Sequence, residues 1–441
     1  MRRLSAAMIA AQVIVGATAM SVVPIRTTHS GRQMAQAVGQ QPVQVRPAAD
    51  SHRVRHPKRR SHAVLPNRTF MGIKQPCPKP QSLVSTTRWT DHRLAPGVAL
   101  SEGVAHDRTV TGDPGTVDMH VLRVRTTDPD VSVAPLVDGW SNRSPLDQLA
   151  ANRPKLVAAT NAGLFDFEPT GPIGPVFDHG RPGSIGSTPQ RTVGITPDGT
   201  VESARVHLAG QVSAAGQQMN VDGFNVLFPS PGLSVYTSAW GPGPIPRGPD
   251  GSKGNVAVVV RHGHVVAAPT TTTASAPREG QLLVASSPAA RRFLGGLQVG
   301  SAVQVRLHVV TEGSHSLTTG FAVAEQLLLG PHRSAPHLGC VERDTQAART
   351  AVGFTSDRKQ LILLVVSDHP RTAMHGLDHR ELAKVMSDLG AAKAWEFDGS
   401  GSSEMIARMP RSGALSIRNF CADGAQRPMP VGLGVFDSRL T

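Results

Sequence analysis

The side chains best suited to chemistry stand close together near the end of the chain, within residues 394–405. An apolar run leads to Asp398, and Gly399 and Gly401 follow in a short polar segment. Glycine allows positive φ angles and a close approach of the backbone, so successive N–H groups can point into one concavity and bind an oxyanion or a phosphate. The segment therefore predicts a carboxyl group beside an anion-binding turn, although Asp-Gly after a strand is also typical of an ordinary turn.

The motifs around this segment follow an order that recurs in one family. Arg349 begins the segment R-T-A-V-G-F, the apolar run L-I-L-L-V-V covers residues 361–366, Glu381 begins E-L-A, and Asp398 lies in F-D-G-S-G-S-S. This order resembles the phosphodiester glycosidase family, in which R-T-A-x-G, an apolar strand, G-L-x-x-x-E-L-A, L-G-A and L-D-G-G-G-S-S recur. The family includes the lysosomal enzyme that removes N-acetylglucosamine from a sugar-phosphate diester.

Further similarities to the same family extend the resemblance over residues 115–438. They lie at residues 160–165, 190–195, 220–225, 233–237, 293–301 and 427–431. The resemblance implies an α+β fold, with a strand-rich domain of mixed sheets and few helices. It also implies a hydrolase that cleaves a sugar-1-phosphodiester to free sugar and a phosphomonoester.

Cleavage at the anomeric carbon needs a proton donor or water activator, stabilisation of an oxocarbenium-like centre, and cationic or N–H donors for the phosphate. Asp398 is the first choice for the carboxyl group, because the turn places it at a strand end. Burial and a bound phosphate would both raise its pKa, which suits a proton donor. Glu396 and Asp166 are candidate second carboxylates, as is Glu325. In the alternative, Asp398 only braces the turn by accepting backbone N–H groups.

Four further side chains are candidate contacts to the substrate. Arg349 carries a guanidinium group, whose fork of donors matches phosphate oxygens. Asn161 stands in a glycine-bearing loop, where it can orient a sugar hydroxyl or a phosphate oxygen, and Ser402 and Ser403 add hydroxyl donors beside the turn glycines. The structural alternatives are a surface salt bridge for Arg349, a turn-forming role for Asn161 and a capping role for the serines.

The chain departs from the family pattern at positions that bear on activity. Ser400 replaces the middle glycine of the triple-glycine turn, Glu396 stands in place of an asparagine, and residues 367–369 read S-D-H instead of D-G-R. At residues 322–327, A-V-A-E-Q-L replaces a glycine-rich segment. Two other functions therefore stay open. One is a non-catalytic binder of anionic glycans that kept the fold, and the other is a membrane-tethered structural protein of the cell envelope.

The formal net charge of +13 is concentrated in the first part of the chain. Residues 24–80 carry 11 Lys or Arg and one acidic residue, whereas residues 81–441 are almost balanced. The charge is thus a property of a tail, and we expect no nucleic acid as a partner of the domain. The basic run at residues 53–60 can bind an anionic envelope polymer or a membrane surface, or it is simply solvated.

The N-terminus has the order of an export signal. Two arginines precede an uncharged run of 22 residues that ends at Ile25, and A-T-A at residues 17–19 is a candidate cleavage site. An uncleaved membrane anchor is the alternative for a run of this length, and both place the bulk of the protein outside the cytoplasm. Residues 26–82 predict a disordered basic spacer, and residues 83–441 the domain. The bias towards Ala, Arg, Gly and Pro indicates a bacterial gene.

Cysteine and histidine usage favours no metal site. Cys77, Cys340 and Cys421 allow a single bridge, and the pairing of Cys340 with Cys421 is preferred because both lie in the domain. The chain contains no C-x-x-C motif. His375 and His379 are four residues apart, but His375 precedes the predicted start of a helix, so the two do not share one helical face. We therefore expect neither a metal ion nor a cofactor.

The clearest helix is predicted over residues 378–389, where Asp378 caps the N-terminus and Glu381 closes a capping box. Apolar alternation predicts strands within residues 115–137, and an apolar run predicts another at residues 256–260. Glycines between residues 163 and 183 predict a long irregular segment, which is typical of a functional loop.

Overall fold

The computed structural model describes residues 80–107, 115–227, 231–246, 255–271, 275–338, 346–369 and 372–440. All of them belong to the unit Lys74–Thr441. The predicted leader and all but the last three residues of the predicted spacer lie outside the described residues, as do Cys77 and Cys340. No helix in the described part is long and apolar enough to cross a membrane.

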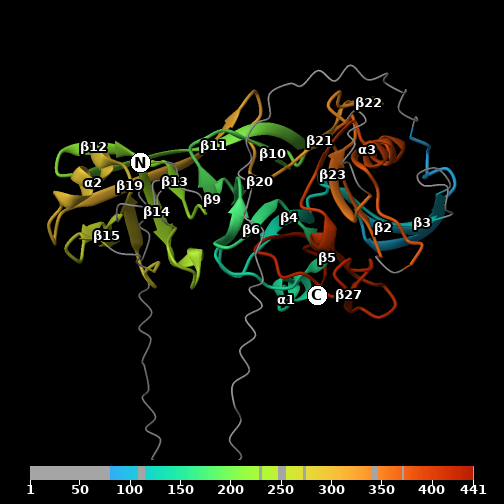
Figure 1. Cartoon of the computed structure of the whole chain (residues 1–441), viewed down its shortest axis with the longest axis horizontal. Coiled ribbons are helices and arrows are strands. Elements are labelled where there is room, and N and C mark those ends of the chain that lie inside the picture. The colour runs from blue at the N-terminus through green and yellow to red at the C-terminus, as the bar shows by residue number, and fades with distance from the viewer. Residues whose placement is uncertain are drawn as a thin grey trace, which may run out of the picture. The chain divides into compact units, whose positions relative to one another are not determined.

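Strands dominate the described part of the chain and form three sheets and one separate hairpin (Figure 1). The eight-stranded sheet has the spatial order β1 (Arg88–Ala95), β2 (Val98–Asp107), β3 (Gly115–Arg125), β24 (Gln360–Val366), β23 (Arg349–Phe354), β25 (Lys393–Glu396), β21 (Gln326–Gly330) and β22 (Arg333–Ser334). The five-stranded sheet has the order β27 (Leu415–Ile417), β26 (Met405–Arg408), β5 (Leu156–Asn161), β28 (Gly432–Asp437) and β4 (Val131–Leu136). The separate hairpin pairs β6 (Leu164–Phe167) with β7 (Thr170–Ile173).

The third sheet has 13 strands. Eleven follow one path, in the order β12 (Gln217–Asn220), β11 (Val201–Ala214), β10 (Gln190–Ile195), β20 (Thr319–Ala322), β8 (Val176–Asp178), β9 (Arg181–Gly186), β13 (Gly223–Phe224), β14 (Leu233–Thr237), β18 (Gln281–Ala285), β15 (Val256–Arg261) and β16 (His264–Val265). Off this path, β17 (Thr270–Thr271) pairs with β15, and β19 (Val303–Glu312) pairs with β11. Among the described strands, β13 and β14 run parallel and the other pairs are antiparallel. The predicted strand-rich fold with mixed sheets and few helices is confirmed.

The described residues form three α-helices, α1 (Leu146–Ala150), α2 (Pro288–Gly295) and α3 (His379–Asp388), and two short 3-10 helices, η1 (Ser238–Trp240) and η2 (Ser400–Ser402). Helix α3 confirms the predicted capping box. Oδ1 of Asp378 accepts the N–H of Glu381 at 2.7 Å, and Oε2 of Glu381 accepts the N–H of Asp378 at 3.0 Å. Helix α2 is not predicted, although Ser287 before Pro288 is a typical N-terminal signal.

Strand β24 shows how the apolar pattern builds the core. Successive side chains of a strand point to opposite faces, and here both faces are buried. Leu363 belongs to the hydrophobic cluster that includes Val157 of β5, while Leu364 packs in the cluster that includes Leu382 of α3. In Figure 1, α3 lies beside β22 and β23. A strand covered on both sides needs no polar alternation, which explains the continuous apolar run at residues 361–366.

The prediction of a long irregular segment between residues 163 and 183 is wrong. It folds as two hairpins, β6 with β7 and β8 with β9. Gly163, Gly174 and Gly180 lie between strands, with φ angles of 66°, 98° and 69°, whereas Gly171 and Gly183 lie within β7 and β9. Strands of three to six residues are too short to show a clear alternation, so the glycines dominate the local pattern.

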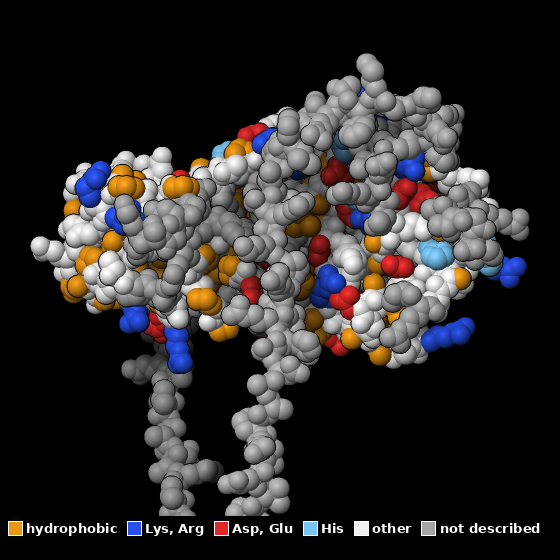
Figure 2. Space-filling view, in the orientation of Figure 1, with side chains coloured by type: hydrophobic (Ala, Val, Ile, Leu, Met, Phe, Trp, Pro, Cys, Tyr) orange, Lys and Arg blue, Asp and Glu red, His pale blue; other side chains and the backbone are white. Residues whose placement is uncertain are grey.

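Charge in the described part is mixed. Where Figure 2 shows described side chains, basic and acidic groups are interspersed among apolar ones on the visible face. This arrangement agrees with the near balance of charge after residue 80.

Candidate functional site

Neighbouring strands of the eight-stranded sheet carry the central residues of the predicted site. β23 begins with Arg349, and its neighbour β25 ends with Glu396, two residues before Asp398. Phe397 is 1% exposed and packs in the core, so Glu396 and Asp398 point to the other side of the strand. A Cβ atom on Gly399 would lie 3.3 Å from Oε1 of Glu396 and 3.7 Å from Cδ of Arg349. The structure therefore brings Arg349, Glu396 and the turn of Asp398 together.

The backbone of Asp398 is held from two sides. The N–H of Asp398 donates to the carbonyl oxygen of Gly163 at 2.9 Å, and the carbonyl oxygen of Asp398 accepts a hydrogen bond from Nδ2 of Asn161 at 2.7 Å. Oδ1 of Asn161 in turn accepts Oγ1–H of Thr350 at 2.7 Å and the N–H of Glu404 at 3.2 Å. Asn161 therefore fixes the loop that carries Asp398, and its amide group is engaged by protein groups.

The carboxyl group of Asp398 is shifted towards its protonated form. Burial raises its pKa above the usual range, and the nearby Glu396 acts in the same direction. Three contacts lower the pKa: Oγ of Ser402 donates to Oδ2 at 2.5 Å, Arg427 attracts the ionised form, and the backbone N–H of Gly399 donates to the carboxyl group. Burial outweighs these contacts, so the group holds its proton at a higher pH than an ordinary aspartate.

The turn after Asp398 places its positive φ angle at an unexpected residue. Ser400 has a φ of 56°, whereas Gly399 has a φ of −107° and Gly401 is not in the positive region. The positive φ angle of the turn thus falls on the residue between the two glycines. Gly401 leaves space for a neighbouring side chain, since a Cβ atom there would lie 2.1 Å from Nη2 of Arg427.

Several N–H groups of this turn are already used by the protein. The N–H of Ser400 donates to the carbonyl oxygen of Ala348 at 2.7 Å. The N–H groups of Ser402 and Ser403 donate to the carbonyl oxygens of Gly399 and Ser400, at 3.2 and 3.0 Å. Three of the amides expected to line the predicted concavity are therefore already engaged by backbone carbonyl oxygens, and the role of the turn in binding an anion stays a prediction. An anion bound here would depend mainly on side-chain donors.

Arg349 is engaged by neighbouring protein groups. Its Nη1 donates to Oε1 of Glu396 at 2.9 Å and lies 3.2 Å from Nε2 of His379, while its Nε donates to the carbonyl oxygen of Leu377 at 3.0 Å. Nε2 of His379 lies 2.8 Å from the other carboxylate oxygen of Glu396. The side chains of Arg349 and Glu396 are only 12% and 7% exposed, so water screens this ion pair weakly. The role of Arg349 in binding phosphate stays a prediction.

Arg427 is a site residue that the sequence does not reveal. Its Nη1 donates to Oγ of Ser402 at 3.2 Å, so it reaches the Asp398 carboxyl group through this hydroxyl. Asp423 holds the guanidinium group by accepting from Nε at 2.8 Å and from Nη2 at 3.1 Å. In the sequence, Arg427 is recognisable only as the first residue of a closing-strand motif. Its contact with Ser402 depends on how the chain folds back.

A second buried carboxyl group, that of Glu404, lies close to the turn. Glu404 is 1% exposed, and its Oε1 accepts the N–H of Arg427 at 2.6 Å. Burial raises the pKa of Glu404 to about 8, and the charge of Asp147 acts in the same direction. The sequence does not predict this pKa shift, because the shift arises from the burial of Glu404 in the folded chain.

Three other predicted residues make no contact with Asp398 among the described residues. Oδ1 of Asp166 accepts the N–H of the next residue at 2.7 Å. Glu325 lies against the imidazole of His337. The hydroxyl group of Ser403 is buried and has no hydrogen-bond partner in the described part of the chain. Of the predicted hydroxyl groups, only that of Ser402 therefore touches the Asp398 carboxyl group.

Cys421 carries a free thiol and is 8% exposed. The predicted Cys340–Cys421 bridge is therefore wrong. Burial raises the pKa of this thiol to about 11, and the nearby Glu404 adds to the effect. The thiol therefore stays protonated at neutral pH and is a poor nucleophile. Within the described ranges, no group of three or more His, Cys, Asp or Glu side chains is placed to hold a metal ion.

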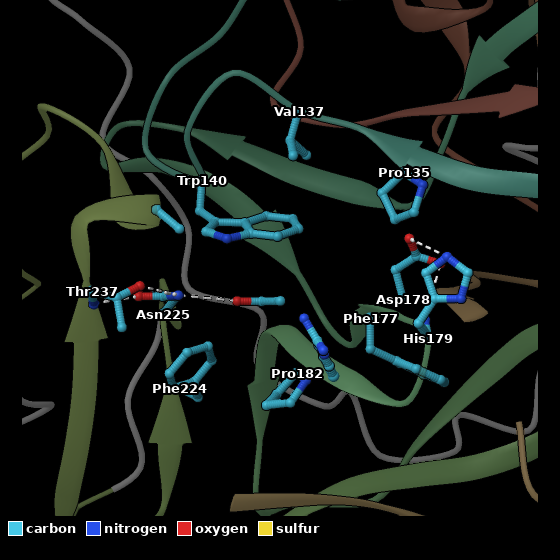
Figure 3. Close-up of a pocket in the computed structure, with 13 residues that line it drawn as sticks. Pro135, Val137, Trp140, Phe177, Asp178, His179, Pro182, Phe224, Asn225 and Thr237 are labelled. Carbon is cyan, nitrogen blue, oxygen red and sulfur yellow. Dashed lines mark hydrogen bonds and ion pairs between the residues drawn. The ribbon is translucent and has the colours of Figure 1, made fainter. Parts of the chain in front are cut away.

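A cavity of about 650 Å³ lies away from these residues and is shown in Figure 3. Trp140 and Phe224 form part of its apolar wall, and Asp178 lies at one end. Nδ2 of Asn225 donates to Oγ1 of Thr237 at 3.2 Å, so this polar group in the wall is already paired. None of the predicted site residues lines the cavity.

Residues 254–436 match the phosphodiester glycosidase family, which confirms the family resemblance seen in the motifs. No curated protein matches the chain.

Three solved structures resemble the fold. A hypothetical protein from Synechocystis is 21% identical with a TM-score of 0.62, and the match covers 79% of this chain but only 64% of that one. A protein from Burkholderia pseudomallei, whose name proposes export, is 15% identical with a TM-score of 0.63, over 82% of this chain and 100% of that one. The catalytic domain of zebrafish N-acetylglucosamine-1-phosphodiester alpha-N-acetylglucosaminidase, auto-inhibited by its pro-peptide, is 14% identical with a TM-score of 0.44, over 80% of this chain and 88% of that one. The first two matches show a shared fold.

Proposed function

We propose, from the match of residues 254–436 to the phosphodiester glycosidase family, that this chain is a hydrolase that cleaves glycosyl phosphodiesters. The observation that carries the proposal is the carboxyl group of Asp398. It stands at the end of β25, burial raises its pKa, and its one side-chain hydrogen bond among the described residues comes from Ser402. A carboxyl group that keeps its proton near a basic side chain is suited to protonating a leaving group.

In the proposed reaction, the bond between the anomeric carbon and the bridging oxygen of the phosphate breaks. The electron pair stays on that oxygen, which takes the proton of Asp398 and leaves as part of the phosphomonoester. A water molecule adds its oxygen to the anomeric carbon, and the proton it loses restores the carboxyl group. The products are the free sugar and the phosphomonoester, as in general acid catalysis of glycoside cleavage.

The neighbouring groups act as positioning residues in this proposal. Asn161 fixes the backbone of Asp398 through its carbonyl oxygen. The ion pair of Arg349 with Glu396 lies against Gly399 and supports the turn. The negative charge of Glu396 disfavours ionisation of Asp398 and so raises the pKa of the acid.

The proposed place of action is outside the cytoplasm. The charge, apolar run and A-T-A order at the N-terminus support export, as does the name of the Burkholderia pseudomallei protein that shares the fold. An envelope polymer with sugar phosphodiester links is a substrate class that fits this location.

Release of free sugar from a panel of sugar-1-phosphodiesters tests the proposal. We expect wild-type protein to release sugar from at least one substrate, and Asp398→Asn to lower kcat by about 10²–10⁴-fold, the range for loss of a general acid. Asp357→Asn, in an exposed turn, serves as the matched control and should retain full activity. An Asp398→Asn protein as active as wild type would refute the assigned role.

The alternative of a non-catalytic binder of anionic glycans is favoured by one observation, the use of the turn amides within the protein. In that case no substrate of the panel is turned over, and Asp398→Asn leaves glycan affinity unchanged.

A further inference from the structure

The β6–β7 hairpin carries an exposed aromatic ring beside two guanidinium groups. The ring of Phe167 is at the end of β6, and the residue is 45% exposed. The guanidinium carbon of Arg143 lies 5.0 Å from the centre of this ring, and that of Arg427 lies 5.7 Å from it. Phe165 packs against the same ring at 5.0 Å. Two cations within cation–π distance of one surface ring are more than packing of the hairpin requires.

The two arginines differ in how their charge is balanced. Arg427 is paired with Asp423 through two hydrogen bonds, so this pair has no net charge. Arg143 has no hydrogen bond or ion pair with any described residue, and its guanidinium group lies over the Phe167 ring. Arg143 therefore supplies the uncompensated positive charge at this place, while Arg427 is held in a fixed orientation.

Two routes connect this cluster to Asp398, one to its carboxyl group and one to its backbone. Arg427 donates to Ser402, which donates to Asp398. The N–H of Asp398 donates to the carbonyl oxygen of Gly163, the residue immediately before β6. Gly163 at the base of the hairpin and Arg427 beside Phe167 therefore both contact the turn that carries Asp398.

We propose that Arg143, Arg427 and Phe167 form the subsite for the phosphate and for the alcohol part of the substrate. The inference rests on the proposed function and adds the substrate class, a diester whose alcohol part is apolar or aromatic next to the phosphate. The phosphate oxygens meet the two guanidinium groups, and the alcohol part packs on the exposed ring of Phe167. The sugar then lies on the Asp398 side, which places the bridging oxygen next to the proton donor.

This arrangement also accounts for the turn amides. Because the N–H groups of Ser400, Ser402 and Ser403 are used within the protein, the phosphate needs donors from side chains. Guanidinium groups are planar and always charged, and they match phosphate oxygens in pairs. Gly401 leaves room for Arg427 to reach the turn, since any side chain there would collide with its guanidinium group.

The test uses binding of phenyl phosphate and methyl phosphate, two phosphomonoesters that differ in the alcohol part, measured by calorimetry with the full-length protein. We expect phenyl phosphate to bind more tightly than methyl phosphate. Arg143→Ala should weaken both by about 10-fold or more, as for loss of a charge-assisted hydrogen bond. Phe167→Ala should remove most of the preference for phenyl, a change of about 3- to 10-fold. Arg261→Ala and Val299→Ala, at exposed positions in or beside other strands, are the matched controls and should bind both compounds as wild type does.

Turnover measurements separate this inference from the proposed function. If wild type releases sugar but Arg143→Ala and Phe167→Ala bind and react like wild type, the subsite is wrong and the function stands. If no diester is cleaved but phenyl phosphate binding depends on Arg143 and Phe167, the function is wrong and the subsite stands. Equal binding of phenyl and methyl phosphate by wild type would overturn the assignment of Phe167.

Discussion

Asp398 and Glu102 are both carboxyl groups that the fold withdraws from bulk water, yet their surroundings shift their pKa values in opposite directions. At Glu102, burial opposes ionisation, but hydrogen bonds from His120 and Arg418 outweigh it and lower the pKa to about 2. Arg418 donates twice to this carboxylate, at 2.9 and 2.8 Å, and Nδ1 of His120 lies 3.2 Å away. At Asp398, the side-chain hydrogen bond is from the neutral hydroxyl of Ser402, and burial prevails.

The difference indicates what each region is for. A carboxylate paired with an arginine and a histidine keeps its charge and ties β2 to the segment after β27. A buried carboxyl group whose donor is a neutral hydroxyl has a raised pKa, a shift in the direction that acid catalysis needs. We therefore propose that the Glu102 cluster serves stability and that the Asp398 turn serves the chemistry.

The largest expected effect separates these two roles. Asp398→Asn should lower kcat by about 10²–10⁴-fold. The melting temperature should stay the same or rise, because a neutral amide is less costly to bury than a carboxyl group that can ionise. Parallel measurement of sugar release and thermal unfolding checks this. A large loss of stability in this variant would mean that Asp398 braces the fold.

Glu102→Gln should have the opposite profile. Removing the charge leaves Arg418 and His120 without their shared partner, and we expect a loss of about 1–3 kcal/mol in unfolding free energy at neutral pH. The folded fraction should retain its kcat. Chemical denaturation and sugar release on the same preparation measure both, and an unchanged stability would show that the cluster contributes little.

The pH dependence of stability sharpens the comparison, because the pKa values of two carboxyl groups, Glu102 and Glu404, are shifted in opposite directions. Glu102 has a folded pKa of about 2, below its ordinary value of 4.5, so its contribution is present above 4.5 and is lost as the pH falls towards 2. Glu404 has a folded pKa of about 8, above its ordinary 4.5, so its contribution is present below 4.5 and is lost as the pH rises through 8.

Two variants isolate these contributions. Relative to wild type, Glu102→Gln should flatten a plot of melting temperature against pH between about pH 2 and 4.5, and Glu404→Gln should flatten it between about pH 4.5 and 8. A Glu404→Gln protein with the slope of wild type between pH 4.5 and 8 would show that Glu404 is not the group that titrates there.

The smallest expected effect comes from Ser402→Ala. The hydroxyl group of Ser402 stabilises the ionised form of Asp398, so its loss should raise the pKa of Asp398 further. An acid acts in its protonated form, and the alkaline limb of kcat/KM should therefore move to higher pH. We expect a change of less than about tenfold in activity at neutral pH. A limb that moves to lower pH would contradict the assignment of Asp398 as the acid.

The sequence predicts those parts of the molecule that are set by local patterns. The capping box of Asp378 and Glu381, the doubly buried strand at residues 361–366 and the strand end at Asp398 all follow from neighbouring residues. The proximity of Arg349 to the Asp398 turn follows from the motif order of the family and from the pairing of β23 with β25.

The remaining features depend on contacts between distant segments. Arg143 and Arg427 meet at Phe167 although they are far apart in the chain. His379 belongs to the first turn of α3, where its position suggests only a helix start, yet it contacts Glu396. The positive φ angle falls on Ser400, and Gly401 leaves room for the guanidinium group of Arg427, a contact that no propensity scale of single residues contains.

Hydrolysis of an aromatic sugar-1-phosphodiester in water enriched in ¹⁸O tests the central claim most directly. Cleavage between the anomeric carbon and the bridging oxygen leaves all original oxygens on the phosphate, so mass spectrometry of the phosphomonoester should show no ¹⁸O. Incorporation of ¹⁸O into the phosphomonoester would mean that water attacks phosphorus, and that result would contradict a glycosidase in which Asp398 protonates the leaving phosphate.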